Sequence, residues 1–423
     1  MAGNPSDQFR TLAGLAPQEA KFFWTGGPTE VAERTWFQSQ FSGCVGFETE
    51  AGLVLVDTGT RMLAPALAAR LRERSAAPVH TAIYTHGHVD HAYGLEAFLL
   101  PGQARPRVIG HRAMPGRFAR YERTPRHNAA VNARQFGGTV KLAEEGSSYD
   151  LFHPPETPPD TLYDGELVLE VGGVRFELHH CRGETDDATW VYCPERGVLC
   201  SGDLFIWCVP NAGNPQKAQR YPWDWADGLR AMAACRPRTL CPGHGGPVVG
   251  EPERIQHMLL ETAGYLDALV EATLAALEDG SPPHVDVVQR VKPPASDSPW
   301  LRPVYDEAEF IVRNVLRYFG GWWSGRPCEL KPAPRSAVAG ELARLAGGAR
   351  ALAARARALA EANELRLAGH LADLALEADP ADGEVQETVA AIYERRAGTE
   401  TSLMARNLFR SAAAYAREGR AFA

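Results

Sequence analysis

Residues 84–94, YTHGHVDHAYG, place His86, His88, Asp90 and His91 within six residues at the end of an apolar run. Side chains that alternate along an extended loop cannot all be buried, and each neutral histidine would need its own polar partner. A purely structural role therefore explains the cluster poorly. Two histidines at positions i and i+2 can chelate one metal ion, while Asp90 and His91 turn toward a second. The loop predicts a binuclear metal site.

Further ligands are expected from later strand ends, because one short loop cannot complete two coordination spheres. Glu184 follows a strand-like run in HHCRGETDD, Asp203 follows another in VLCSGDLF, and His244 lies in LCPGHGGP. Each lies beside glycine, where the backbone leaves room for a side chain to enter a site. For Glu184 or Asp203 alone, a turn or helix cap is an equally good interpretation. Together with the histidine loop, the three residues are better explained as metal ligands.

The surrounding pattern predicts a layered α/β domain. Residues 41–60 alternate short β-branched or aromatic runs with glycine turns, as in a hairpin followed by a buried strand. A helix and further strands follow, at 61–74, 79–85, 166–171, 174–180, 189–192, 197–200 and 239–241. Between residues 111 and 162 the signals weaken into a polar, proline-bearing insertion, which we predict to be a lid or binding loop.

After residue 250 the composition changes to long helical patterns, first at 254–278 and 304–319. From residue 336 onward Ala, Leu, Arg and Glu recur at helical spacing, and DPADG (379–383) separates two helices. We expect a small helical bundle that packs on the first domain or on another subunit. The predicted boundaries are a catalytic domain over 1–285 and a helical domain over 286–423.

The charge and the cysteine and apolar content of the chain exclude several classes of binding partner. The 423 residues carry a net charge of −8, which removes the general attraction of a basic chain to nucleic acid or anionic lipid. No stretch approaches 18 uninterrupted apolar residues, and the N-terminus lacks the pattern of a secretory signal. The eight cysteines form no CxxC pair. We therefore expect a cytoplasmic protein with neither a membrane nor a nucleic acid as partner.

The metal loop, followed by three ligands at strand ends, resembles the metallo-β-lactamase superfamily, whose fold is an αββα sandwich with the site at one edge. That superfamily usually has a histidine where this chain has Glu184. The substitution, together with YTHGHVDH itself, is similar to the alkylsulfatase branch, or class III sulfatases, whose loop reads YTHSHVDHFGG. Asp57 in LVLVDTGT lies where the superfamily often keeps an acid that supports a ligand, and a turn cap is an equally good interpretation.

The C-terminal part adds to this resemblance. Residues 299–310, PWLRPVYDEAEF, and 375–397, ALEADPADGEVQETVAAIYERRA, resemble the helical dimerisation domain of alkylsulfatases. The chain departs from that family in four ways. We expect neither a secretion signal nor a sterol-carrier-like C-terminal domain. Asp203 stands where the family tends to carry a glutamate, and the segment after Asp203 has no histidine to act as acid.

The resemblance implies a ligand set for two Zn²⁺ ions. His86, His88 and Glu184 would hold one ion, and Asp90, His91 and His244 the other. Asp203 and a water or hydroxide would lie between them, with Asp203 and Asp90 as the catalytic residues. Because Glu184 adds a negative charge to the site, iron or manganese in place of zinc stays open.

Substrate contacts are expected from a small set of polar and aromatic residues. Arg220 and Lys217 would bind the sulfate, with Asn128 and Asn132 from RHNAAVNARQFGG, a segment similar to NAMSRRA of the family, and Trp207 would line the organic part. For single residues of these types, a solvated or core position is the commoner outcome.

These observations predict a metal-dependent hydrolase that cleaves alkyl sulfate esters with a metal-activated water. One alternative keeps the site and changes the small ester substrate to a thioester, lactone or phosphoester. A remote alternative is a non-catalytic dimeric binding protein, which the complete set of seven metal-ligand positions disfavours. The alanine-rich helices and the resemblance together predict a homodimer.

Overall fold

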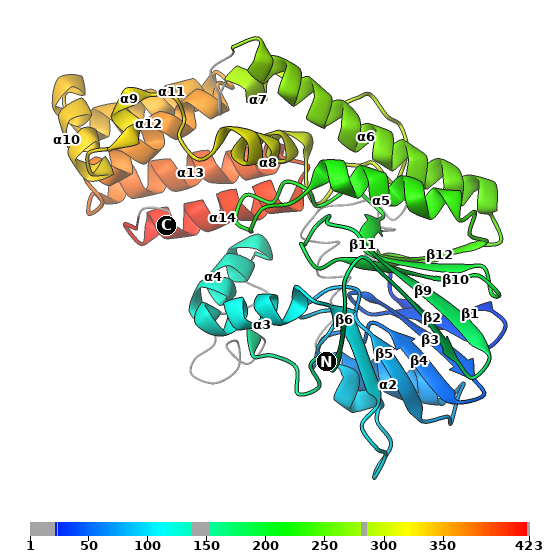
Figure 1. The fold of residues 1–423 in the computed structure, drawn as a ribbon. Helices are drawn as coiled ribbons and strands as arrows, with labels where there is room; N and C mark the ends of the chain where they lie inside the picture. The colour runs from blue at the N-terminus through cyan, green and yellow to red at the C-terminus, as the bar shows by residue number, and fades with distance from the viewer. Residues whose placement is uncertain (1–21, 23, 138–151, 281–285, 421–423) are drawn as a thin grey trace. The chain divides into compact units, whose positions relative to one another are not determined.

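The computed structural model describes residues 22, 24–137, 152–280 and 286–420, and the chain forms two compact units (Figure 1). The first contains residues up to 129 together with 143–319. The second contains residues 130–142 together with 320–423. Residues 286–319 thus belong to the first unit, and the boundary expected after residue 285 stays a prediction.

The first unit is built on two sheets. One sheet has seven strands in sequence order: β1 (Gly26–Ala32), β2 (Thr35–Ser39), β3 (Gly43–Thr49), β4 (Gly52–Val56), β5 (Val79–Ile83), β6 (Arg107–His111) and β7 (Thr161–Tyr163). β1 to β4 pair antiparallel, whereas β4 to β7 pair parallel. The predicted hairpin within residues 41–60 is β3–β4, and the buried strand that follows its turn is β4.

The second sheet runs in the order β13, β12, β11, β10, β9, β8. Its strands are β8 (Glu166–Val171), β9 (Val174–His180), β10 (Thr189–Cys193), β11 (Val198–Ile206), β12 (Thr239–His244) and β13 (Val248–Val249). All neighbours are antiparallel except β11 and β12, which are parallel. The carboxyl ends of β11 and β12 therefore reach the same edge of the sheet.

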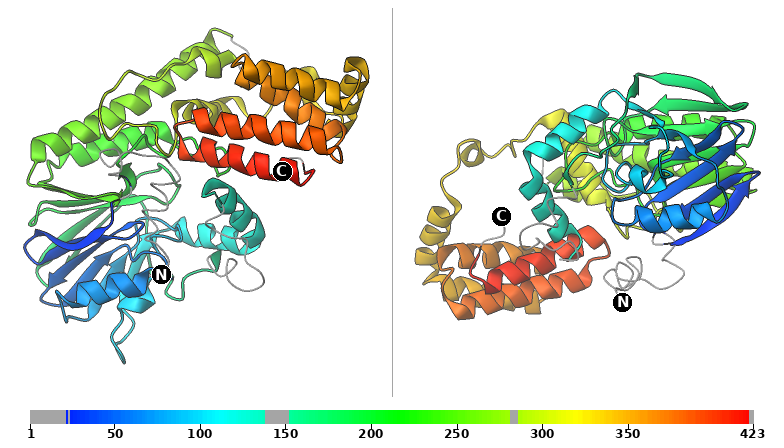
Figure 2. Two further views of the ribbon diagram at one scale, coloured as in Figure 1. Left: turned by 180° about the vertical axis from the view of Figure 1, so that it is seen from behind. Right: turned by 90° about the horizontal axis from the view of Figure 1, so that it is seen from below.

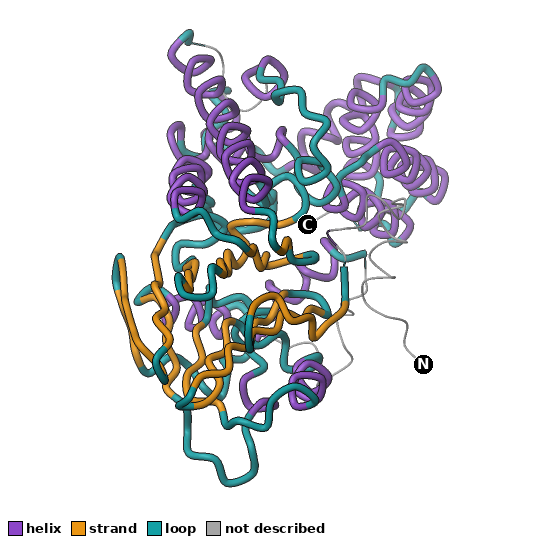
Figure 3. The backbone as a smooth tube through the Cα atoms, turned by 90° about the vertical axis from the view of Figure 1, so that its right-hand side faces the viewer, coloured by secondary structure: helices purple, strands orange, loops and turns teal. Residues whose placement is uncertain are grey.

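An apolar layer joins the two sheets, which Figure 3 shows as stacked strands. Val54 and Val56 of β4 lie in this inner layer, whereas Leu53 and Leu55 belong to a second core on the outer face of the same sheet. This division follows from the two-residue side-chain period of a strand. A strand that is apolar on both faces must be covered on both, so β4 is central in the fold.

Helices cover the outer faces of the sandwich. Those of the first unit are α2 (Ala64–Arg72), the 3₁₀ helix η2 (Leu95–Phe98), α3 (Met114–Arg123), α5 (Pro222–Ala234), α6 (Pro252–Glu278), α7 (Asp286–Arg290) and α8 (Ala308–Gly320), whose last residue begins the second unit. Leu67 and Leu71 of α2 pack against the outer core of the first sheet. Trp225 of α5 is fully buried and its indole donates to Leu204 O of β11 at 2.7 Å. The αββα prediction is therefore confirmed.

The insertion at 111–162 is more regular than the sequence indicated. It contains α3 and α4 (Pro125–Gln135), and residues 138–151 lie outside the described part of the chain. Pro115 and Pro125 suggested an irregular loop, but each lies in the first turn of its helix. Proline fits there because the missing N–H has no intrahelical partner in any case.

The second unit contains a helical bundle. Its helices are α9 (Pro327–Leu330), α10 (Arg335–Ala346), α11 (Ala349–Glu361), α12 (Leu365–Ala378), α13 (Gly383–Thr399) and α14 (Leu403–Arg417), and Figure 2 shows the longer ones side by side in orange and red. Small side chains such as Ala356, Ala372 and Ala390 fill the core between them. The predicted break at DPADG ends with Asp382, which caps α13 by accepting from Glu384 N at 2.9 Å. The helical class of this region is confirmed.

Among the helices of the described residues, none combines the length and apolarity needed to cross a bilayer.

Candidate functional site

The histidine loop leaves the sandwich at the end of β5. Its start is fixed by Asp57, which follows the neighbouring parallel strand β4 and accepts from Thr85 N at 2.7 Å and from Thr85 Oγ1 at 2.6 Å. Because parallel strands end at the same edge, a residue after β4 can reach the loop after β5 directly. Asp57 has a positive φ of 58°, a conformation that aspartate and asparagine tolerate better than most residues.

Six predicted ligands form two groups around this loop. The first comprises His86, His88 and Asp203, and the second comprises Asp90, His91 and His244. Within each group, one donor atom per residue lies within 4.8 Å of the others. Since each group has the nitrogen and oxygen donors that divalent transition metals accept, both are candidate metal sites.

Asp203 lies between the two groups. Its Oδ2 is 3.7 Å from His86 Nε2, and its Oδ1 is 3.2 Å from His91 Nε2 and 3.4 Å from His244 Nε2. His91 Nε2 and Asp203 Oδ1 are both buried, and neither has a hydrogen bond of normal geometry within the described chain. Buried polar atoms are rarely left unpaired in proteins, and His91 Nε2 presents a lone pair toward Asp203 when its Nδ1 carries the ring proton. The arrangement fits a divalent cation.

The sequence placed Asp203 and His244 just past strand ends, and the structure corrects this. Asp203 lies inside β11, and His244 is the last residue of β12. The register between the two strands is irregular around Gly202, which has a positive φ of 51°. A Cβ at Gly243 would overlap Asp203 Oδ1, so glycine there leaves the space that the carboxylate occupies.

Contacts behind the ligands orient two of the histidine rings. His91 Nδ1 donates to Asp57 Oδ2 at 2.7 Å. His244 Nδ1 lies 2.8 Å from Phe41 O, and because a carbonyl oxygen can only accept, Nδ1 carries the proton and Nε2 faces the cluster. Such contacts fix which ring nitrogen is free to bind a metal. Asp57 thus contacts His91, one of the predicted ligands, and its support of a metal ligand stays a prediction.

The pKa values reflect burial and the mixture of charges. Burial lowers the pKa of His86 to about 3 and holds that of His88 well below its usual range. Burial also opposes ionisation of Asp203, but His244 and His91 outweigh it and hold its pKa well below the usual range. His86 and His88 are thus neutral, with lone pairs available to a metal.

Glu184 lies beside His88, with 3.9 Å between Glu184 Oε1 and His88 Nδ1. The same Oε1 is 2.7 Å from Arg220 Nη1 and accepts from Asn211 Nδ2 at 2.7 Å. All three polar side chains are buried, and burial raises the pKa of Glu184 to about 7 although Arg220 opposes this. Arg220 Nη1 also donates to Asn211 O at 2.6 Å, whereas its Nε is buried without a hydrogen-bond partner in the described chain.

A second buried ion pair supports the middle of the histidine loop. Asp187 Oδ2 accepts from Gly87 N at 2.8 Å, and its Oδ1 accepts from Arg117 Nε at 2.9 Å. Arg117 comes from α3 and also pairs with Asp186. Helix α3 of the insertion therefore contributes to the framework of the loop.

The other residues expected to contact substrate lie in different surroundings. Lys217 is half-buried, and burial together with Arg220 lowers its pKa to about 8. Trp207 is buried and its Nε1 donates to Gly246 O at 2.7 Å. Asn128 of α4 donates to Thr124 O, just before that helix, at 2.8 Å, and Asn132 belongs to the second unit. Contacts of these residues with a substrate stay predictions.

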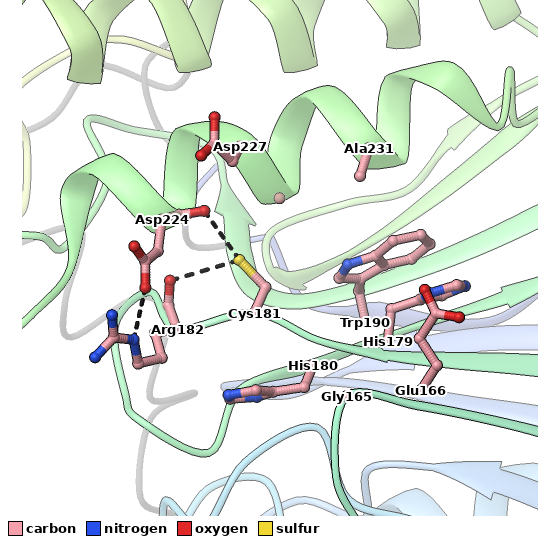
Figure 4. Close-up of a pocket in the computed structure, with 11 residues that line it drawn as sticks. Gly165, Glu166, His179, His180, Cys181, Arg182, Trp190, Asp224, Asp227 and Ala231 are labelled. Carbon is pink, nitrogen blue, oxygen red and sulfur yellow. Dashed lines mark hydrogen bonds and ion pairs between the residues drawn. The ribbon is translucent and has the colours of Figure 1, made fainter.

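A separate open pocket of about 460 Å³ lies between α5 and the ends of β9 and β10 (Figure 4). Its walls include Trp190 stacked on His179 at 4.0 Å, and Asp224 paired with Arg182 at 2.6 Å. None of the seven predicted metal ligands lines this pocket.

Sequence reasoning missed three buried residues next to the site: Asn211, Asp306 and Asn314. Asn211 contacts Glu184 directly, and the other two contact the chain segment that carries Asn211 and Arg220. Asn211 lies eight residues after Asp203 in an irregular segment. The only nearby sequence feature is the proline before it, which indicates a turn and not a functional residue. Asp306 and Asn314 lie in the region interpreted as a dimerisation domain, where no functional signal was sought.

Two sequence families match the chain. The metallo-β-lactamase superfamily matches residues 41–244, and the alkyl sulfatase dimerisation family matches residues 284–419. The chain is 26% identical over 324 residues to a linear primary-alkylsulfatase from Pseudomonas sp., a match that covers 71% of this chain and 60% of that protein. It is 24% identical over 394 residues to an (R)-specific secondary-alkylsulfatase from Pseudomonas sp., covering 88% and 59% respectively. The chain thus spans about three fifths of the length of these relatives.

The fold has a solved counterpart. The stereoselective inverting sec-alkylsulfatase Pisa1 from Pseudomonas sp. superposes with a TM-score of 0.84 at 19% identity, over 98% of this chain and 70% of that one. At this identity the likeness shows a common fold. The two family matches place residues 41–244 in the metallo-β-lactamase superfamily and residues 284–419 in the alkyl sulfatase dimerisation family.

Proposed function

We propose that this protein is a metal-dependent hydrolase of alkyl sulfate esters. The observation that carries the proposal is the pair of donor groups that share Asp203, in a chain of the alkylsulfatase-like branch. The named alkylsulfatase relatives support the substrate class. The free Nε of buried Arg220 adds a donor for an anionic group beside the cluster.

We propose two Zn²⁺ ions as the cofactors. His86 and His88, with Glu184 next to them, would hold one ion; Asp90, His91 and His244 would hold the other, and Asp203 would bridge. When bound, such ions supply a nucleophile at neutral pH by lowering the pKa of a water ligand from 15.7 to about 7. Metal analysis of protein purified without added metal tests the identity, and a content dominated by iron or manganese would replace zinc in the proposal.

The chain's own residues supply position and charge. A sulfate monoester carries one negative charge, which the buried guanidinium of Arg220 and the half-buried ammonium of Lys217 would attract. Burial strengthens these interactions because little water screens them. Asp203, whose pKa is held well below its usual range, would orient the nucleophile, and Asp90 would complete the second group.

The same site can act on other small esters, so the test is a panel. Release of inorganic sulfate from primary and secondary alkyl sulfates is measured beside hydrolysis of thioester, lactone and phosphoester probes, with metal-replete protein. Asp203→Ala should abolish turnover, while Asp227→Ala, an exposed aspartate of the same unit, should retain it. Turnover of another probe without any sulfate release would move the function to that ester class.

We also propose a homodimer assembled through the region that matches the alkyl sulfatase dimerisation family. The catalytic domain would then extend to about residue 285 and the dimerisation domain from 286 onward. Light scattering at micromolar concentration should give the mass of two chains. A mass of one chain would contradict the dimer and leave the proposed chemistry unaffected.

A further inference from the structure

The segment between β11 and α5 brings two side chains to Glu184 although it has no helix or strand of its own. Asn211 near its start and Arg220 at its end both contact Glu184 Oε1 at 2.7 Å. An irregular segment does not fix its own conformation, because its backbone groups lack the regular pairing of a helix or sheet. The position of both side chains must therefore depend on what holds this backbone.

Asp306 holds the first part of the segment. Its Oδ2 accepts from Gly213 N at 2.6 Å and from Asn214 N at 3.2 Å, and its Oδ1 accepts from Glu307 N at 2.8 Å. The carboxylate has no exposed surface. Gly213 lies so close to the start of α8 that a Cβ there would be 2.5 Å from Ile311 N. One buried carboxylate thus ties this turn to the residues before α8.

Asn314 of α8 holds the end of the segment. Its Nδ2 donates to Arg220 O at 2.9 Å and its Oδ1 accepts from Arg220 N at 3.3 Å, so one amide side chain holds both backbone polar groups of Arg220. Gln219 Nε2 donates to the same Oδ1 at 3.2 Å, and Arg317 Nε donates to Gln219 Oε1 at 3.0 Å. Asn314 is only 3% exposed, and an amide buried among partners of this kind favours a single arrangement.

We infer that Asn314, with Asp306, positions Arg220 for the anionic group of the substrate. Both residues lie within residues 284–419, the region that matches the alkyl sulfatase dimerisation family, so part of that region also belongs to the site. The inference rests on the proposed function, because it assigns Arg220 to the sulfate group. Arg220 is the group that touches substrate, and Asn314 and Asp306 act through it.

Asn314→Ala tests the inference, with Arg313→Ala as the matched control on the exposed side of the same helix. Removing the amide leaves both backbone groups of Arg220 without these partners and lets the guanidinium move. We expect KM for an alkyl sulfate and Ki for inorganic sulfate to rise about tenfold, which corresponds to about 1.4 kcal/mol of binding free energy. The value of kcat and the metal content should change much less. Asp306→Asn should shift KM in the same direction.

Hydrogen exchange of the peptides that cover residues 209–221 gives a readout that does not need turnover. Asn314→Ala should exchange faster there than the wild type or Arg313→Ala. Unchanged exchange would overturn the inference, and so would faster exchange with KM and Ki unchanged, because the amide would then be structural only. A wild type that hydrolyses no sulfate ester would refute the proposed function, and the exchange comparison would still decide whether Asn314 holds the segment.

Discussion

Replacing Asp57 by asparagine should weaken metal binding without disturbing the fold. Asp57 is buried and accepts three hydrogen bonds, two from Thr85 and one from His91 Nδ1. Asparagine has the same shape and tolerates the positive φ at this position. Its oxygen can keep the bond from Thr85 N, and the Thr85 hydroxyl can rotate to accept from the new NH₂ group. What cannot be kept is the hydrogen bond that His91 Nδ1 donates.

The size of the effect follows from the tautomer of His91. An amide NH₂ facing Nδ1 requires that Nδ1 be unprotonated, which moves the ring proton to Nε2. That atom faces Asp203 Oδ1 at 3.2 Å and is the proposed metal donor. If His91 keeps its original tautomer, its Nδ1–H faces an N–H of the new amide. The hydrogen bond to the charged carboxylate is then lost, and a bond of that kind contributes about 1.5–3 kcal/mol. We therefore expect a 10- to 100-fold weaker affinity for one of the two proposed ions.

The assay is a competition titration of the apoprotein with Zn²⁺ against a chromophoric chelator. Asp164→Asn is the matched control, because Asp164 also lies beside a histidine, His111, at 3.6 Å, but on the exposed surface and outside the cluster. The control should bind both ions as the wild type does. Two unchanged affinities for Asp57→Asn, in a protein of wild-type thermal stability, would refute the reasoning that this carboxylate fixes the donor atom of His91.

Three further outcomes are expected. Removing the metal with a chelator should lower the free energy of unfolding, by about 2.7 kcal/mol if the ion was present at 100 times its Kd, and an unchanged Tm would argue against a structural contribution of the ion. Gly243→Ala should reduce metal content well below that of the wild type, because the added methyl overlaps the carboxylate of Asp203; full metal content would contradict this. Arg117→Ala should destabilise the protein by about 3–5 kcal/mol in denaturant unfolding, because Asp187 would keep a buried charge without its partner, whereas exposed Arg112→Ala should change stability by less than about 0.5 kcal/mol.

Regular alternation made much of the sandwich predictable from sequence. β8 and β9 have the bounds that the pattern of residues 166–180 indicated, and glycines 172 and 173 form the turn between them. The insertion was harder, because its helices begin at prolines. A proline in a sequence usually indicates the end of a helix. Pro115 and Pro125 are compatible with their helices only because each lies in the first turn.

The candidate site was predictable as a set of residues but less so as a geometry. The residues between His86 and His91 must lie close together in any fold, because one short loop carries them. The sequence could not predict that Arg220 Nη1 pairs with Glu184, because this contact depends on the path of residues 211–220. Asp306 and Asn314 hold this path, and nothing in the local sequence links residues almost a hundred positions apart.

The uneven distribution of the predicted ligands along the chain has a consequence for folding. Four of them lie between residues 86 and 91, whereas Glu184, Asp203 and His244 reach the cluster only after the second sheet has formed. The denatured chain would therefore already contain a short chelating peptide, which would compete with the proposed native site for the same ion. Binding to that peptide reduces the net stabilisation that the metal gives to the native state. If the proposed metal bound there first, it would lie next to β5 while the later strands were still unpaired.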